Sequence, residues 1–296
     1  MPSTFTLESS VLSAVDDLSL VARGVVEGFF DGLHRSPFLG YSTEFSAYRP
    51  YAKGDNLKHI DWKVWGRTDE LYVKQFEDDT NVRCQVLLDV SGSMDFGAGD
   101  TNKFAYGRVL AAALSYLMVR QHDAPGLVLF GAGGRQVVPP VAARHQAEEI
   151  FHALASARPG GVTALGPELL QIVDTITRRG FAVVISDFFS AEESVFELLR
   201  RLHARGQEIL VFHVLAPEEL ELPYEGEFLM EDAETGEEMV VHGESFREEY
   251  RARVEAFCDR VRAECVRYEV EYRRLRTDER LDLALMTYLE SRAAYG

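Results

Sequence analysis

The chain has few cysteines, an excess of acidic over basic residues, and no long apolar run. Its 296 residues include three cysteines, Cys84, Cys258 and Cys265, without a C-x-x-C pair, which argues against a disulfide framework and a cysteine-rich zinc site. The 31 Lys and Arg residues stand against 48 Asp and Glu residues, for a formal net charge of −17. Coating nucleic acid or an anionic membrane is therefore not the expected task.

Signals for membranes and export are missing as well. The longest apolar stretch, residues 109–119, is interrupted by Ser115 and is too short to cross a bilayer. No basic segment followed by an apolar one stands near Met1, so no secretory signal is expected. These observations predict a soluble, cytoplasmic protein without a membrane span.

What the chain does contain is enough apolar material for a core, in two parts that meet near residue 80. Hydrophobic residues make up 46% and aromatic residues 11% of the sequence, which excludes wholesale disorder. Residues 1–79 are expected to form an N-terminal module, with helix-spaced apolar residues between 7 and 30 and then an aromatic-rich extended segment. Residues 80–296 are expected to form one larger domain.

In this larger domain, short apolar strands alternate with segments of helical length. The pattern predicts strands at 82–89, 127–130, 181–186, 208–214 and 266–272, and helices at 103–121, 143–156, 165–177, 190–202, from 245 onward and at 278–291. Such alternation favours parallel pairing through right-handed crossovers. We therefore expect an α/β fold with a doubly wound, mostly parallel sheet, which binds ligands at the carboxyl ends of its strands.

Oxygen-bearing side chains gather at three of these expected strand and helix ends. Asp89, Ser91 and Ser93 follow the first strand, Thr163 precedes a helix, and Asp187 follows a later strand. A small hard cation prefers such oxygen donors and keeps several waters. The set predicts a site for Mg²⁺, with Mn²⁺ as the alternative. The competing interpretation is that Asp89 caps a helix and the serines are ordinary turn residues.

The pattern of Asp89, Ser91, Ser93, Thr163 and Asp187 resembles the metal-ion-dependent adhesion site of von Willebrand factor A-type domains. The flanking sequence resembles the bacterial family called domain of unknown function 58, through Gly40–Phe45, Arg49–Tyr51, Gly54–Asp55, Ile60–Trp62 and Val73–Glu77. This likeness extends over nearly the whole chain.

The resemblance implies a von Willebrand factor A-like fold and a role for each site residue. Ser91, Ser93 and Thr163 would contact the metal, and Asp89 and Asp187 would contact it directly or through water. It also implies a protein partner, a MoxR-type AAA ATPase that supplies an acidic residue to the metal. The leading hypothesis is thus a non-enzymatic, Mg²⁺-dependent protein-interaction module, an adaptor in a chaperone or maturation system.

Two other functions stay open. A metal-dependent hydrolase acting on phosphate esters would use the ion as a Lewis acid, and Asp95 is the only nearby candidate for its base. In a purely structural protein the metal would be incidental.

The segment 49–74 mixes basic residues with aromatic ones. Arg49, Asp55, Asp61 and Trp62 are candidates for a partner-binding surface. The favoured interpretation is a folded module that packs Trp62 and Trp65 against the larger domain, with an internal ion pair between Asp61 and Arg49. Single-stranded nucleic acid binding is disfavoured because four acidic residues offset six basic ones.

A long acidic segment lies between Arg205 and Arg247, which enclose no Lys or Arg. Residues 227–231 and 238–242 within it are expected to form a hairpin, part of an insertion at about 217–244. The segment is interpreted as a solvated surface or as a docking face for a basic partner.

Overall fold

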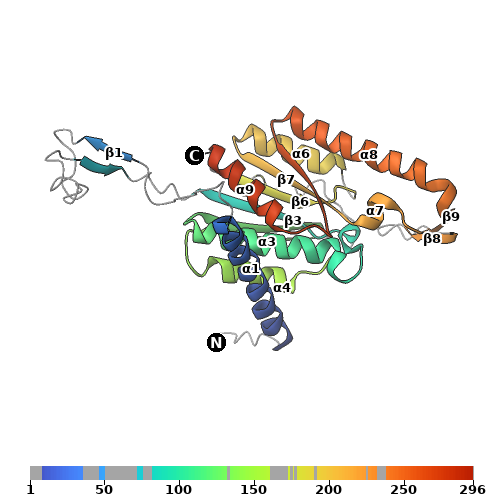
Figure 1. Cartoon of the computed structure of the whole chain (residues 1–296), viewed down its shortest axis with the longest axis horizontal. Coiled ribbons are helices and arrows are strands. Elements are labelled where there is room, and N and C mark those ends of the chain that lie inside the picture. Colours follow the sequence, from blue (N-terminus) through green and yellow to red (C-terminus); the bar gives the residue numbers. More distant parts are fainter. Residues whose placement is uncertain are drawn as a thin grey trace. The chain divides into compact units, whose positions relative to one another are not determined.

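A computed structural model of the chain (Figure 1) describes residues 9–35, 47–50, 72–75, 82–131, 134–160, 173, 176, 179–189, 192–224, 226–231 and 238–295. The helix expected at 165–177 lies almost entirely outside these residues.

Contacts divide the chain into two units, Met1–Phe29 with Val82–Gly296, and Phe30–Asn81. In the smaller unit, β1 (Ala47–Pro50) pairs antiparallel with β2 (Tyr72–Gln75). The sequence predicts that the first helix is part of the N-terminal module. Its residues up to Phe29 group instead with the larger unit.

Helix α1 (Ser9–Arg35) groups with the larger unit because one stripe of its side chains is buried. The stripe consists of residues spaced three or four apart, which lie on one side of a helix: Leu18, Ala22, Val26 and Phe29. Beside it, the Arg23 guanidinium lies 5.7 Å from the centre of the Tyr116 ring and 3.7 Å from the Glu148 carboxylate. The helix thus packs against α3 and α4, to which these two residues belong.

The larger unit is built on a six-stranded sheet in the order β10-β7-β6-β3-β4-β5. Its strands are β3 (Arg83–Asp89), β4 (Ala124–Gly131), β5 (Gly134–Val138), β6 (Phe181–Ser186), β7 (Glu208–Leu215) and β10 (Glu271–Arg276). All pairs are parallel except β4 with β5. The predicted α/β fold with a mostly parallel sheet is confirmed, whereas the antiparallel edge strand β5 was not predicted.

Helices cover both faces of the sheet (Figure 1). One face packs against α3 (Lys103–Arg120), α4 (Gln146–Ser156) and α9 (Asp282–Tyr295), and the other against α6 (Glu192–Ala204) and α8 (Gly243–Arg267). Strand β6 illustrates the division, because Phe181 meets Tyr288 of α9 whereas Ala182 packs with Leu198 of α6 and Val261 of α8. Because both faces of the sheet are covered, the residues of β3, β4, β6 and β7 are almost continuously buried.

The last strand is not where the sequence predicts it. Helix α8 continues to Arg267, and β10 occupies residues 271–276 rather than 266–272. The acidic segment contains a short helix, α7 (Pro217–Glu221), and the antiparallel strands β8 (Glu227–Glu231) and β9 (Glu238–His242). These two strands have the bounds predicted for the hairpin.

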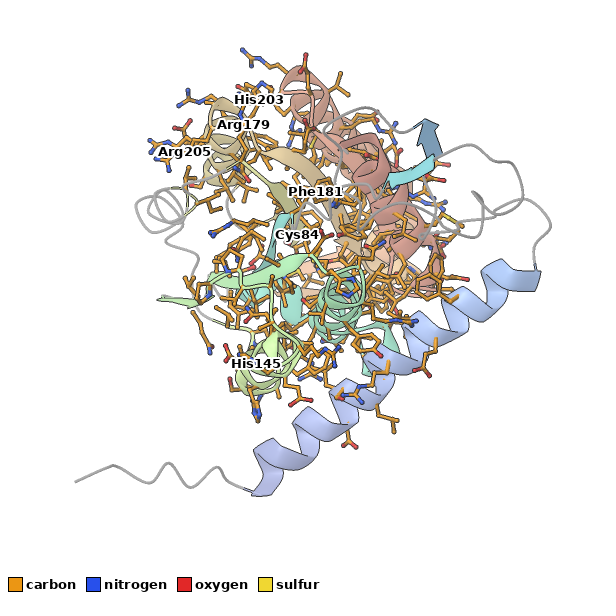
Figure 2. The ribbon with its side chains drawn as sticks, turned by 90° about the vertical axis from the view of Figure 1, so that its left-hand side faces the viewer. Cys84, His145, Arg179, Phe181, His203 and Arg205 are labelled. Atoms are coloured by element: carbon orange, nitrogen blue, oxygen red, sulfur yellow. The ribbon has the colours of Figure 1, made fainter. Side chains whose placement is uncertain are left out.

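The two ends of the sheet differ in chemistry. At the amino end, Cys84 of β3 pairs with Phe181, the first residue of β6, and the two lie side by side (Figure 2). At the carboxyl end, β3 ends with Asp89 and is followed by Val90 and Ser91, and β6 is followed by Asp187. The polar residues singled out in the sequence therefore belong to the carboxyl end.

Candidate functional site

Strands β3 and β6 are neighbours whose connections leave in opposite directions. From β3 the chain continues to β4, and from β6 it continues to β7 on the other side. At such a switch point, the connections separate and leave a crevice beyond the strand ends. Asp89 ends β3 and Asp187 directly follows β6, so both carboxylates lie where a ligand of this fold class is expected.

A continuous set of hydrogen bonds joins four of the five residues expected at the site. Asp89 Oδ1 accepts from the Ser91 backbone N–H at 2.9 Å, and its Oδ2 accepts from the Ser186 hydroxyl at 2.6 Å. The Ser91 and Ser93 hydroxyl oxygens are 3.0 Å apart, and Ser93 donates to Asp187 Oδ1 at 3.1 Å. Since Ser93 uses its proton on Asp187, the Ser91 hydroxyl is the donor between the two serines.

A buried lysine of α3 also belongs to the cluster. The ammonium of Lys103, at the first position of α3, donates to Asp187 Oδ2 at 2.6 Å and to the Glu219 carboxylate. Lys103 and Asp187 are fully buried, and Glu219 is 7% exposed. Burial lowers the pKa of Lys103, but Asp187 and Glu219 raise it by more, so the pKa stays above its ordinary value and the group is charged.

Glu219 reaches Lys103 from α7 because of how that helix starts. Pro217 occupies the first turn, and Glu219 accepts a hydrogen bond from the Ala216 backbone N–H at 2.9 Å. This is the acidic half of a capping box, which fixes the position of the carboxylate.

The turn after β6, which begins at Asp187, contains a residue with a strained backbone. Phe188 has a φ of 62°, which is unfavourable for a side chain of its size. Its N–H donates to the Ser186 hydroxyl at 2.9 Å, and the Phe189 N–H donates to Asp187 Oδ1 at 3.1 Å. Strained residues of this kind persist where the surroundings fix them, often at functional sites.

His213 supports the same turn from β7. Its Nε2 lies 3.1 Å from the Asp187 carbonyl oxygen, and its Nδ1 lies 2.8 Å from the Tyr272 hydroxyl. A carbonyl only accepts, so Nε2 carries the proton and Nδ1 accepts from Tyr272. Burial lowers the pKa of His213 to about 4, so the ring is neutral and positions the Asp187 backbone.

Close backbone packing holds the loop that carries the two serines. The Val90 N–H donates to the Phe130 carbonyl at 2.7 Å, and the Gly160 N–H donates to the Val90 carbonyl at 3.1 Å. Gly131 has a φ of 124°, and a Cβ there would lie 2.6 Å from the Ser91 nitrogen. Thr163, the fifth expected residue, lies outside the described residues, three positions after Gly160.

Two exposed aromatic rings flank the buried ammonium. Lys103 Nζ lies 5.5 Å from the centre of the Phe96 ring and 5.0 Å from that of Phe189. Phe96 is 36% and Phe189 40% exposed, and Phe189 also stacks on Phe257 with centroids 4.9 Å apart. Apolar surface therefore adjoins the polar cluster.

The cluster carries more negative than positive charge. Lys103 binds Asp187 and Glu219, and Asp89 adds a third carboxylate that lies close enough to Asp187 to be affected by its charge. Burial, and next the charge of Asp187, raise the pKa of Asp89 to about 7. A cation bound within this group would reduce the free-energy cost of burying ionised carboxylates.

The donor set fits a hard divalent cation. In the described part of the chain, no three His, Cys, Asp or Glu side chains are placed to hold a metal ion. The oxygens of Ser91, Ser93, Asp89 and Asp187 nevertheless form one connected group with surplus negative charge, as Mg²⁺ or Mn²⁺ prefers.

The other expected site residues are not brought to this cluster by any described contact. Arg49 lies in β1 opposite Val73, and Asp55, Asp61 and Trp62 fall outside the described residues. Asp95, the candidate base, is exposed and accepts a hydrogen bond from the Asn102 amide at 3.2 Å.

Sequence reasoning missed Lys103, Glu219 and Ser186. Glu219 was counted in an acidic segment interpreted as a surface, but it is buried against Lys103. The sequence feature that could have identified Glu219 is the proline two residues earlier, because a proline followed by acidic residues is typical of the first turn of a helix. A lysine or serine at an element end carries no comparable signal.

The chain matches a known protein family. A family model, "Protein of unknown function DUF58", matches residues 47–259. The chain belongs to the DUF58 family. It is 28% identical over 235 residues to "Uncharacterized protein Rv1480" of Mycobacterium tuberculosis, covering 77% of this chain and 73% of the relative.

This chain also resembles solved structures, at lower sequence identity. BatB from Bacteroides thetaiotaomicron shares 19% identity with a TM-score of 0.44, covering 72% of this chain and 99% of that one. An aerotolerance-related membrane protein from Bacteroides fragilis shares 20% identity with a TM-score of 0.47, covering 71% and 98%. In the present DUF58 chain, no helix within the described ranges is long and apolar enough to cross a bilayer.

Proposed function

We propose that this DUF58 chain is a protein-interaction module whose strand-end cluster holds a divalent cation. The observation that carries the proposal is the hydrogen-bonded set of Asp89, Ser91, Ser93 and Asp187 at the switch point of the sheet. Mg²⁺ is the favoured ion and Mn²⁺ the alternative. Ser91 and Ser93 would hold it, together with Thr163, whereas Asp89 and Asp187 would act directly or through water.

The chemistry of the donors suits binding of a partner's carboxylate. Hydroxyl ligands leave much of the ion's charge unneutralised, so a bound ion would remain an electrophile towards an acidic residue. Lys103 already occupies one oxygen of Asp187, which reduces the negative charge that this residue offers to the ion.

The surroundings suit a protein rather than a small molecule. Phe96 and Phe189 expose apolar rings beside the cluster, and aromatic residues are enriched where proteins dock. We propose a MoxR-type AAA ATPase as the partner, as the sequence resemblance implies, with an acidic residue of the ATPase directed at the ion. Arg49, Asp55, Asp61 and Trp62 remain proposed as a further partner-binding surface.

The proposal is tested by affinity for the purified ATPase, measured by surface plasmon resonance at one fixed Mg²⁺ concentration. Metal chelation is avoided, because the ATPase itself uses Mg²⁺. Asp89→Asn should weaken binding by about tenfold or more through loss of the cation. Asp95→Asn, the same change on a neighbouring exposed residue, should bind like the wild type.

Equal binding by the wild type and Asp89→Asn, with matching circular dichroism spectra, would refute the proposal. The same samples should be assayed with a generic phosphate ester. Turnover that Asp95→Asn abolishes would instead establish the hydrolase hypothesis, with Asp95 as its base.

A further inference from the structure

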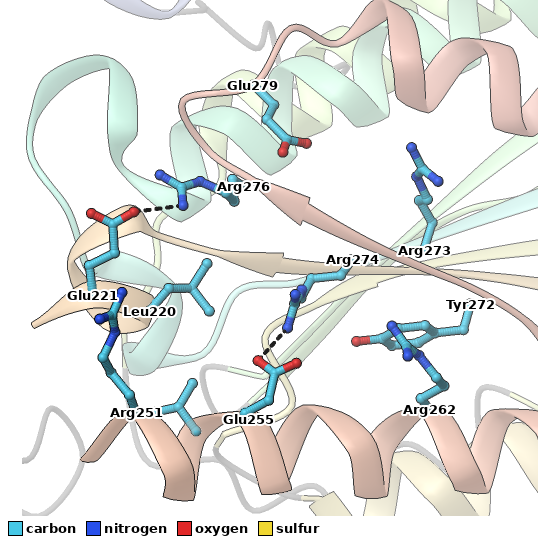
Figure 3. Close-up of a pocket in the computed structure, with 11 residues that line it drawn as sticks. Leu220, Glu221, Arg251, Glu255, Arg262, Tyr272, Arg273, Arg274, Arg276 and Glu279 are labelled. Carbon is cyan, nitrogen blue, oxygen red and sulfur yellow. Dashed lines mark hydrogen bonds and ion pairs between the residues drawn. The ribbon is translucent and has the colours of Figure 1, made fainter. Parts of the chain in front are cut away.

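A groove rich in arginine opens between α8 and the edge strand β10 (Figure 3). Its volume is about 580 Å³. Five guanidinium groups line it together with three glutamates; the arginines are Arg251, Arg262, Arg273, Arg274 and Arg276. This positive surplus stands out in a chain with a net charge of −17.

Two of the five guanidinium groups are neutralised within the groove. Arg274 pairs with Glu255 at 2.8 Å, and Arg276 pairs with Glu221 at 2.8 Å. Arg262 lies 5.5 Å from the centre of the Tyr272 ring and forms an exposed ion pair with Asp259 at 4.0 Å.

The other two, Arg251 and Arg273, form no hydrogen bond or ion pair with any residue that the structure describes. A groove that contains unpaired guanidinium groups attracts anions. Arginine is also well suited to carboxylates, because its planar fork can donate two parallel hydrogen bonds.

The groove follows an unpaired sheet edge. All six residues of β10 pair with β7 on one side, and no described strand pairs with the other side. Tyr272 and Arg274 point towards α8, whereas Arg273 lies on the opposite side of the strand (Figure 3). The free edge is thus flanked by guanidinium groups on both sides, over roughly 20 Å of strand.

We propose that this edge binds an extended, carboxylate-rich segment of a partner protein. The segment would add a strand beside β10, with backbone hydrogen bonds giving affinity and alternate carboxylates pairing with the guanidinium groups on either side. Charge complementarity between the guanidinium groups and a carboxylate-rich segment selects this occupant. The inference uses residues outside the strand-end cluster and stands independently of the proposed function.

Fluorescence anisotropy with a short labelled peptide of alternating Glu and Val tests the proposal, with the Lys and Val peptide as the reversed-charge control. The double variant Arg251→Glu and Arg273→Glu should weaken binding of the acidic peptide by about tenfold or more. The matched double variant Arg253→Glu and Arg267→Glu changes net charge equally, on exposed positions of α8 outside the groove. Its affinity should stay within about twofold of the wild type.

Four results would overturn the proposal. The first is no binding of the acidic peptide at physiological salt, and the second is equal weakening by both double variants, which would reflect net charge alone. The third is equally tight binding by a peptide with alternate backbone nitrogens methylated, because no strand would then be added. The fourth is tighter binding of a single-stranded oligonucleotide with the same sensitivity to Arg251 and Arg273.

Discussion

Lys103 is the residue on which the charge balance of the cluster depends. Its ammonium is fully buried and binds the carboxylates of Asp187 and Glu219. A buried charge left without its partner costs far more than an exposed one. Lys103→Met should therefore lower the free energy of unfolding by about 3–5 kcal/mol, measured by urea denaturation.

An exposed ion pair provides the control for this change. Arg253 is paired with Glu249 at 2.5 Å on the surface of α8. Arg253→Met should lower the free energy of unfolding by about 0.5 kcal/mol or less. If Lys103→Met and the wild type unfold at the same urea concentration, the buried ion pairs do not contribute as described.

Gly131 is required by both its backbone and its surroundings. A side chain there would meet the Ser91 nitrogen, and the φ of 124° disfavours any other residue. Gly131→Ala should lower the free energy of unfolding by more than about 1 kcal/mol. Gly24→Ala, in α1 with open space around it, should instead raise it by about 0.5–1 kcal/mol. Equal effects of the two substitutions in thermal unfolding would contradict this explanation.

At the residue scale, the sequence identifies the oxygen donors that follow β3 and β6 but not the buried pair of Lys103 and Glu219. Asp89, Ser91 and Ser93 form a recognisable spacing, and Asp187 follows a strongly apolar strand. Lys103 and Glu219 lie 116 positions apart, and their contact depends on how α3 and α7 pack. No local pattern records such a contact.

Helix α1 is the element whose place the sequence predicts least well. Its apolar spacing predicts a helix, but not the surface that the helix covers. Val26 is fully buried whereas Leu20, on the same helix, is 72% exposed. Val26→Ser should lower the free energy of unfolding by about 1.5–3 kcal/mol, and Leu20→Ser should change it little.

Urea denaturation of both variants tests whether α1 is part of the larger unit. A cost for Val26→Ser no greater than that for Leu20→Ser would show that the helix is not packed there.

The end of α8 shows how two periodicities compete. Val266, Tyr268, Val270 and Tyr272 alternate as in a strand, which led to the prediction of a strand at 266–272. The helical stripe that contains Val261 and Cys265 is completely buried, however, whereas Val266 is 69% exposed. Packing of the stripe against the sheet therefore extends the helix to Arg267, and β10 begins only at Glu271.

The polarity of edge strands explains a second missed element. Strand β5 pairs only with β4, and its residues Arg135 and Gln136 interrupt the apolar pattern. One-sided pairing makes a strand shorter and more polar than a central one. The central strands β3, β6 and β7 were predicted to within one residue of their observed bounds, whereas β4 was predicted at 127–130 and begins at Ala124, because Pro125 and Gly126 are not typical of a strand.

For the whole molecule, charge distribution matters more than net charge. The chain is strongly acidic, yet five of its arginines line one groove, and two of its buried carboxylates, Asp187 and Glu219, bind one buried lysine. These two arrangements would serve partners of the same chemistry in different ways, one through guanidinium groups and one through a cation. Long-range attraction of such acidic partners would have to overcome the overall negative charge.

Thermal unfolding at increasing Mg²⁺ concentration tests the central claim most directly. A ligand that binds only the folded state at about 100 times its dissociation constant adds about 2.7 kcal/mol to stability. The melting temperature of the wild type and of Asp95→Asn should therefore rise with Mg²⁺, and that of Asp89→Asn should not. An equal rise in all three proteins would contradict a cation site at the ends of β3 and β6.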